Sequence, residues 1–242
     1  MLEDLVGSVM VDVSERMAIR TTKIEGIEHR NITVKEHALA HRWLDGLRGI
    51  ELGAAAHNPF GLEGSTHMSP GDDFDVARQA ELKMNGCYAE IDVTASAENL
   101  PVSESSQDYI ISSHVFEHLP DPIKVLLEWN RVVRNGGYLF MIVPQRDALE
   151  TDKSRPLTSL EQWLDIHARA NVTVDNWNDL FPANQVPRRG HYHVYTPNTL
   201  VALIETVAAR YRLNWDLVDR ENPDSKVGNG FTLVYRIRKV SN

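Results

Sequence analysis

Hydrophobic and polar positions fall into clear blocks over residues 108–143, which predicts the most regular part of the fold. The apolar run at 109–111 is long enough for a buried strand. An Asp-Pro pair at 121–122 then predicts a helix start, because aspartate caps the helix and proline fits its first position. Asn-Gly-Gly at 135–137 is expected to end this helix, since glycine tolerates a left-handed conformation. The nearly unbroken apolar run at 138–143 indicates a strand buried on both faces, so the unit is βαβ.

The same periodicities predict further elements on both sides of this unit, and together they indicate an α/β protein. Residues 1–34 are a mixed extension and a candidate lid over a cleft. The remaining predicted elements are helices at 35–47, 71–85, 157–168 and 198–210, and strands at 49–52, 65–70, 88–93, 212–218 and 231–238.

Composition narrows the class of protein. With 242 residues, 42% hydrophobic and 24% charged, the chain fits one large soluble domain. A formal net charge of -9 without a Lys/Arg cluster disfavours binding to nucleic acid. Cys87 is the only cysteine, which excludes an internal disulfide and a cysteine-rich zinc site and fits a reducing compartment. No apolar stretch is long enough for a membrane span, and the N-terminus lacks a signal-like pattern, so a cytoplasmic enzyme is expected.

The run Gly-Ile-Glu-Leu-Gly at 49–53 combines a strand, a buried acid and a tight turn. Gly53 lets the backbone approach a ligand closely, because it has no side chain. A G-x-G-x-x-G sequence and a Walker A sequence are both absent, which argues against a nicotinamide enzyme and a P-loop nucleotide site.

Three segments together carry a family resemblance: 49–53, SSHVFEHLPDP at 112–122, and RVVRNGG at 131–137. They resemble class I S-adenosylmethionine (SAM)-dependent methyltransferases, in particular the type 11 group. The resemblance covers about residues 47–143. It implies a doubly wound, mostly parallel, seven-stranded Rossmann-like sheet with a C-terminal antiparallel strand and an insertion after strand five.

That fold implies a single domain over 1–242. Its parts are the extension at 1–34, a cofactor-binding core at 35–143, an acceptor-binding insertion at 144–196, and a C-terminal helix and strands at 197–242.

The resemblance also implies which residues bind SAM. The chain departs from the glycine-rich motif, because Ala55 and His57 stand where relatives have glycine, so the turn must differ in detail. Residues 97–99 resemble a segment that passes the adenine ring, although a plain surface loop explains them too. Ser69 matches the position that holds the ribose, with aspartates 72 and 73 just beyond it. The expected cofactor-binding residues are Glu51, Gly53, Ala55, Ser69, Ala97, Glu98, Asn99, Ser113 and His114.

For the acceptor side, the expected catalytic residues are His118, Asp152 and His193, which supply a general base for a hydroxyl. A structural role for His118 is equally open. His191 and His193 alternate onto one face of an extended segment and, with Asp152 or His118 nearby, could form a general base or a divalent-metal site. Such a pair is more often structural, so no metal ligand is assigned, and a metal-assisted reaction stays an alternative.

Aromatic residues of the insertion suit a sugar or polyol acceptor, and core packing explains them equally well. The predicted function is therefore O-methylation of a small molecule or glycan hydroxyl by SAM. N-methylation and a non-catalytic SAM-binding regulator remain the alternative functions. Whether the protein forms a homodimer stays open.

Overall fold

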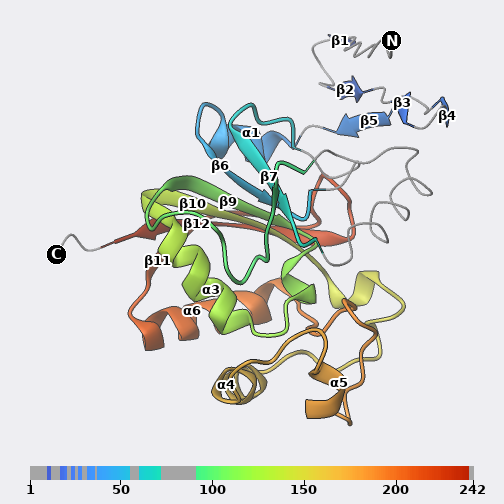
Figure 1. Ribbon diagram of the computed structural model, residues 1–242, viewed down its shortest axis with the longest axis vertical. Helices are drawn as coiled ribbons and strands as arrows, with labels where there is room; N and C mark the ends of the chain where they lie inside the picture. The colour runs from blue at the N-terminus through green and yellow to red at the C-terminus, as the bar shows by residue number, and fades with distance from the viewer. Residues whose placement is uncertain are drawn as a thin grey trace.

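The computed structural model describes residues 37–54, 60–71 and 91–239 in full, together with the backbone of five short N-terminal strands. Those strands lie apart from the main sheet, at the upper right of Figure 1. They form a three-stranded antiparallel sheet in the order β1-β2-β5 and a two-stranded sheet of β3 and β4. Their bounds are β1 Met10–Val11, β2 Met17–Arg20, β3 Lys23–Ile24, β4 Ile27–Glu28 and β5 Ile32–Lys35.

The main sheet has seven strands in the order β11-β12-β10-β9-β6-β7-β8. The five strands from β8 to β10 pair in parallel, and β12 is antiparallel to both β10 and β11. This confirms the predicted doubly wound sheet with an antiparallel C-terminal strand. The strands are β6 Gly49–Leu52, β7 Ser65–Ser69, β8 Val93–Thr94, β9 Gln107–Ser113, β10 Val133–Pro144, β11 Asn214–Glu221 and β12 Gly230–Arg238.

Helices cover both faces of this sheet. Figure 1 places α1 (Ala38–Leu44) on one face and α3 (Pro122–Val132) with α6 (Pro197–Tyr211) on the other. Side chains of β9 alternate between the two cores: Tyr109 packs toward α1, whereas Ile110 packs toward α3 and α6. The middle of a strand that is buried on both faces is apolar at successive positions, which is why residues 109–111 show no polar alternation.

The central βαβ unit matches its prediction except at the end of the helix. The Asp121 side chain accepts a hydrogen bond from the Lys124 amide at 3.0 Å, as an N-cap should. The helix stops at Val132, because Val133 is already extended and pairs with β9. The prediction that residues 135–137 end the helix was therefore wrong. Gly136, at φ 79, lies instead in an irregularity within β10.

The insertion after β10 contains η2 (Arg146–Ala148), α4 (Leu160–Ala168) and α5 (Trp177–Leu180). Of these, α4 and α5 lie beyond α3 and α6, at the bottom of Figure 1. Trp177 and Tyr192 belong to a small core that the insertion builds for itself, and Trp163 is buried in the main core. Core packing therefore accounts for both tryptophans.

The other predicted elements agree with the structure to within a few residues where it describes them. The predicted helix at 71–85 lies outside the described residues except for its first residue, and so does the first half of the predicted strand at 88–93. In the described half, only Val93 is in a strand, as the first residue of β8. Among the helices that the structure describes, none is long and apolar enough to cross a membrane.

Candidate functional site

The candidate site lies where the parallel strands β6, β7, β9 and β10 end. The carboxyl ends of parallel strands meet at one edge of the sheet, and ligands of such folds bind there, where the strand order reverses. The reversal falls between β6 and β9, which are neighbours in the sheet although β7 and β8 come between them in the sequence. Two of the predicted motifs, after β6 and after β9, therefore lie side by side.

Gly53 makes the tight turn that leaves β6. Its φ is 63, in the left-handed region, and its amide donates to the Met68 carbonyl at 2.8 Å. A Cβ on this residue would lie 2.5 Å from Cγ2 of Val115, in the loop after β9. Two requirements, the left-handed backbone and the close approach, thus select glycine here. Ala55, the next predicted cofactor residue, lies outside the described residues.

Glu51 is fully buried beneath this turn. One carboxylate oxygen lies 3.4 Å from the Phe60 amide and 3.7 Å from Nε2 of His67. This buried carboxylate thus connects β6 to Phe60 and to His67 of β7. Its predicted contact with the positive end of SAM stays a prediction.

The predicted ribose position, Ser69, is the last residue of β7, and its carbonyl accepts from the Ala95 amide at 2.9 Å. Asp92, the residue before β8, accepts a hydrogen bond from the His67 amide at 2.8 Å, so its carboxylate supports β7. Aspartates 72 and 73, the suggested alternatives to Ser69, lie outside the described residues.

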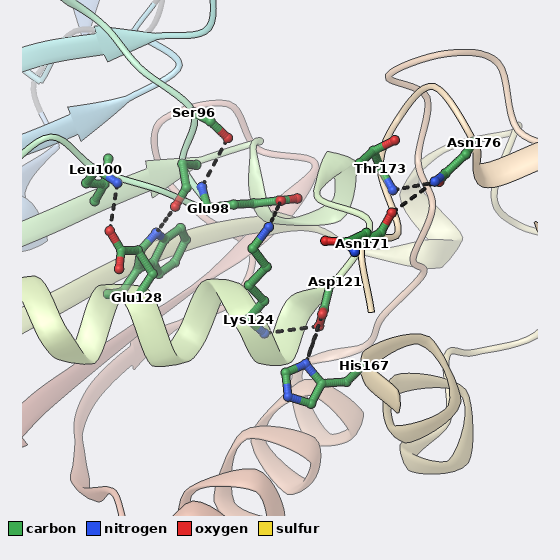
Figure 2. A network of polar contacts seen from close by, with 12 residues as sticks. Ser96, Glu98, Leu100, Asp121, Lys124, Glu128, His167, Asn171, Thr173 and Asn176 are labelled. Atoms are coloured by element: carbon green, nitrogen blue, oxygen red, sulfur yellow. Dashed lines mark hydrogen bonds and ion pairs between the residues drawn. The ribbon is translucent and has the colours of Figure 1, made fainter. Parts of the chain in front are cut away.

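Residues 97–99, the predicted adenine-side segment, are held firmly by α3 (Figure 2). The indole of Trp129 donates to the Ala97 carbonyl at 3.0 Å, and Lys124 pairs with the Glu98 carboxylate at 2.9 Å. The Asn99 amide donates to the carbonyl of Ser96 at 3.1 Å. These contacts fix the shape of the loop. The Glu98 carboxylate is already paired with Lys124 of α3.

Ser113 and His114 follow directly at the end of β9. Ser113 is buried, and His114 takes a left-handed conformation, with φ 52. The Nδ1 atom of His114 lies 3.7 Å from Oε1 of Glu117, and its Nε2 has no hydrogen-bond partner among the described residues. Burial lowers the pKa of His114, while the nearby carboxylate acts in the opposite direction, so the ring is neutral at neutral pH.

The loop after β9 meets the end of the insertion at Glu117. The Glu117 carbonyl accepts from the Tyr192 amide at 2.9 Å, which brings His191 beside His118. The two imidazole rings meet edge to face, with centroids 4.7 Å apart. The predicted residue His118 therefore belongs to a cluster of polar side chains at this edge of the sheet.

Asp152 joins this cluster through His191. One of its oxygens lies 2.5 Å from Nδ1 of His191, and the other accepts from Arg155 at 3.0 Å. Since Asp152 is almost completely buried, the pair holds the His191 ring in one orientation. Asp152 is thus placed to act through His191.

His193 lies in a different environment from the cluster. Its side chain is buried between Trp177 and Tyr195, and its Nε2 donates to the Pro120 carbonyl at 3.1 Å. Burial lowers the pKa of His193 to about 4. This environment suits a structural residue, so we retain only His118 and Asp152 in the proposal below.

Two residues of the cluster, Glu117 and His191, were not among the predicted catalytic residues. In the sequence, Glu117 follows an apolar residue in a loop motif that contains several other polar residues, and nothing local distinguishes it from them. His191 was noted only as the partner of His193 in the alternation. The signal that was available is the excess of histidines, at 114, 118, 191 and 193, around two loops that the fold brings together.

The main sheet has the fold of the class I SAM-dependent methyltransferases. When only the strands of the main sheet are numbered along the chain, their order is 3-2-1-4-5-7-6, and strand seven (β12) is antiparallel. This is the order of that class. The predicted cofactor residues that the structure describes lie at the ends of β6, β7 and β9 and in the loop after β8, and their binding of SAM stays a prediction. Residues 55–141, about a third of the chain, match the family model described as a methyltransferase domain, of type 11.

A curated relative supports the same assignment. A probable S-adenosylmethionine-dependent methyltransferase of Mycolicibacterium smegmatis is 30% identical over 88 residues, which cover 36% of this chain and 34% of that protein. The match thus spans about a third of the relative's length.

Among solved structures, a SAM-dependent methyltransferase of Methanosarcina mazei is similar, with a TM-score of 0.48, 14% identity, and coverage of 84% of this chain and 99% of that chain. One from Aquifex aeolicus has a TM-score of 0.43, 16% identity, and coverage of 81% and 84%.

Proposed function

We propose that the protein transfers the methyl group of SAM to a hydroxyl group of a small molecule or of a sugar or glycan. The observation that carries this proposal is the cluster of Glu117, His118, His191 and Asp152 beside His114, one of the predicted cofactor residues. A neutral hydroxyl must lose its proton to become a good nucleophile, whereas an uncharged amine need not. A cluster of imidazoles and carboxylates at the strand ends supplies groups for that step.

The residues of the chain have distinct parts in this reaction. SAM, when bound, supplies a methyl group made electrophilic by the sulfonium. Gly53 and the loop at 97–99 fix the cofactor side, so the acceptor oxygen can approach in line with the bond that breaks. His118, or His191 held by Asp152, accepts the hydroxyl proton as the new bond to carbon forms.

A surface hollow at the end of β10 suits a polar acceptor. A hollow of about 340 Å³ lies between the end of β10 and the turn before β12. Its polar lining includes Gln145, Asp147, Asn222 and Asn229. Amide and carboxylate groups that line a hollow can hydrogen-bond several hydroxyls of one ligand, which favours a sugar or polyol over an apolar acceptor.

The test is a methyl-transfer screen with isotopically labelled SAM against sugars, polyols and amines. The product's methyl group is assigned to oxygen or nitrogen by NMR. We expect an O-methyl product, a turnover number that falls by about 10²- to 10⁴-fold in His118→Gln, and unchanged binding of S-adenosylhomocysteine by calorimetry. The matched control is His167→Gln, a partly exposed histidine that pairs with Asp121 on another part of the surface.

Two outcomes would contradict the proposal. Methylation of nitrogen alone would make the protein an N-methyltransferase. Cofactor binding without turnover of any acceptor would make it a SAM-binding regulator.

A further inference from the structure

We propose that Glu117, His118 and His191 form a binding site for a divalent cation of the zinc type. Each residue offers one ligand atom, and these three atoms all lie within 4.8 Å of one another. The sequence alone predicted no resident metal, because the partners of the histidines come from segments that only the fold brings together.

The distances suit a compact metal site. Nε2 of His118 lies 3.5 Å from Oε1 of Glu117, and Nε2 of His191 lies 3.9 Å from the same oxygen. Ligand atoms about 2.0–2.1 Å from a tetrahedral zinc ion are about 3.3 Å apart. To share one ion, the two histidine nitrogens would move about 0.2 Å and 0.6 Å closer to Glu117, and up to about 1.5 Å closer to each other.

Hydrogen bonds on the far side of each ring fix which nitrogen is available. Nδ1 of His118 lies 2.8 Å from the Arg189 carbonyl, which can only accept, so Nδ1 carries the proton. Nδ1 of His191 likewise donates to the Asp152 carboxylate. Both Nε2 atoms then present lone pairs toward Glu117. A histidine whose other nitrogen donates to a carboxylate or carbonyl is the usual form of a metal ligand.

Glu117 supplies the second, independent observation. Its side chain is fully buried, and neither carboxylate oxygen has a hydrogen-bond partner within the described parts of the chain. An isolated buried carboxylate is costly. The lone pairs of both histidine Nε2 atoms point toward this carboxylate and repel it. A cation between the three groups would attract all of them.

A proton shared with His118 is the competing explanation, and the geometry disfavours it. Charge-assisted hydrogen bonds between nitrogen and carboxylate oxygen are about 2.7–2.9 Å long. The distances from Glu117 to its histidine neighbours all exceed this length. The gap matches an ion better than a proton.

The donor set indicates the kind of metal. Two imidazoles and one carboxylate suit zinc and similar transition metals, whereas magnesium and calcium prefer oxygen ligands throughout. Three protein ligands also leave a fourth position for water or a substrate oxygen.

The role of this open position rests on the proposed function. An acceptor hydroxyl bound there loses its proton to solvent water more readily, because the cation stabilises the alkoxide. The oxygen then forms its bond to the methyl carbon, and the electrons of the breaking carbon–sulfur bond stay on sulfur. In the loaded site His118 is a ligand, and the cation takes over its task as a base.

The first test is calorimetric titration of zinc into the full chain, stripped of metal with chelator and without SAM. We expect one zinc ion per chain with a dissociation constant of about micromolar or tighter. Glu117→Gln and His191→Gln should each weaken binding by about 100-fold, and Asp152→Asn by about 10- to 100-fold through loss of support for His191. His167→Gln is the control and should leave zinc binding unchanged.

Circular dichroism and thermal unfolding of each variant check that it remains folded. Failure of wild type to bind zinc would overturn the proposal, and so would equal binding by wild type, Glu117→Gln and His191→Gln.

The second test separates this inference from the proposed function. Methyl transfer is measured after chelator treatment and again after zinc is restored. Activity that falls and returns supports the acceptor role. Equal activity in both states would refute that role while leaving the methyltransferase proposal intact. Zinc binding in a protein that binds SAM but methylates nothing would retain the metal site and refute the proposed function.

Discussion

Replacing His193 by glutamine should make the protein less sensitive to acid. The His193 ring is buried, and burial lowers its pKa from the ordinary value of 6.5 to about 4. Glutamine can still donate to the Pro120 carbonyl, but it has no charge to gain. The substitution therefore removes a proton-binding group while it retains a donor for the nearest acceptor.

The sign and size of the effect follow from proton linkage. Below pH 6.5 the unfolded chain binds a proton at His193 that the folded protein refuses until about pH 4. Protonation thus favours unfolding, and stability falls as the pH drops through this window. The full loss is about 3 kcal/mol below pH 4, and about 2 kcal/mol is lost between pH 7.5 and pH 5.

The assay is urea unfolding of wild type and His193→Gln at pH 7.5 and at pH 5. Other groups that titrate in this range, such as His37 and His114, are present in both proteins, so their contributions largely cancel in the comparison. We expect wild type to lose about 2 kcal/mol more than the variant on acidification. Equal losses in the two proteins would show that His193 is accessible to protons, and would reopen its predicted role as a catalytic base.

Two further predictions concern the cofactor side. Gly53→Ala should destabilise the protein and weaken binding of S-adenosylhomocysteine by about tenfold or more, because the added methyl would lie 2.5 Å from a neighbouring side chain. The control is Gly46→Ala, because Gly46 is also left-handed but an added Cβ would have no described atom within 4 Å. Equal affinity of both variants for S-adenosylhomocysteine, measured by calorimetry, would contradict the argument. Trp129→Phe should cost about 1–3 kcal/mol of stability by leaving the Ala97 carbonyl without its donor, and should also weaken cofactor binding. The control is Trp215→Phe, which removes an indole hydrogen bond to the Asn130 side chain. Urea unfolding should show that this variant is less stable, and calorimetry should show that its affinity for the cofactor is unchanged.

The fold was predictable because its strongest signals are local. The Asp121 cap, the apolar strand at 138–143 and the glycine turn at 53 each depend on neighbours in the sequence, and each is present in the structure. The one local error, the helix end, also has a local cause: strand pairing of Val133 with β9 competes with continuation of the helix, and pairing wins.

The site was less predictable, because its chemistry depends on contacts between distant segments. Nothing near Glu117 in the sequence indicates that its carboxylate will be buried beside histidines from two loops. His191 and His193 are equivalent in the alternating pattern, yet one faces Glu117 and the other a backbone carbonyl in the core. Only the docking of the insertion onto the loop after β9 distinguishes them.

That docking makes the insertion part of the site. The backbone of Glu117 holds Tyr192, whose ring packs on Trp177 with centroids 4.6 Å apart, inside the insertion's own small core. His191 and its partner Asp152 both belong to the insertion, so their position relative to His118 depends on how that core packs. A cavity in this core would shift one half of the cluster against the other, and shifts of an ångström are enough to lower catalytic rates substantially. In the proposed reaction, the buried aromatic residues of the insertion would position the cluster without touching the acceptor.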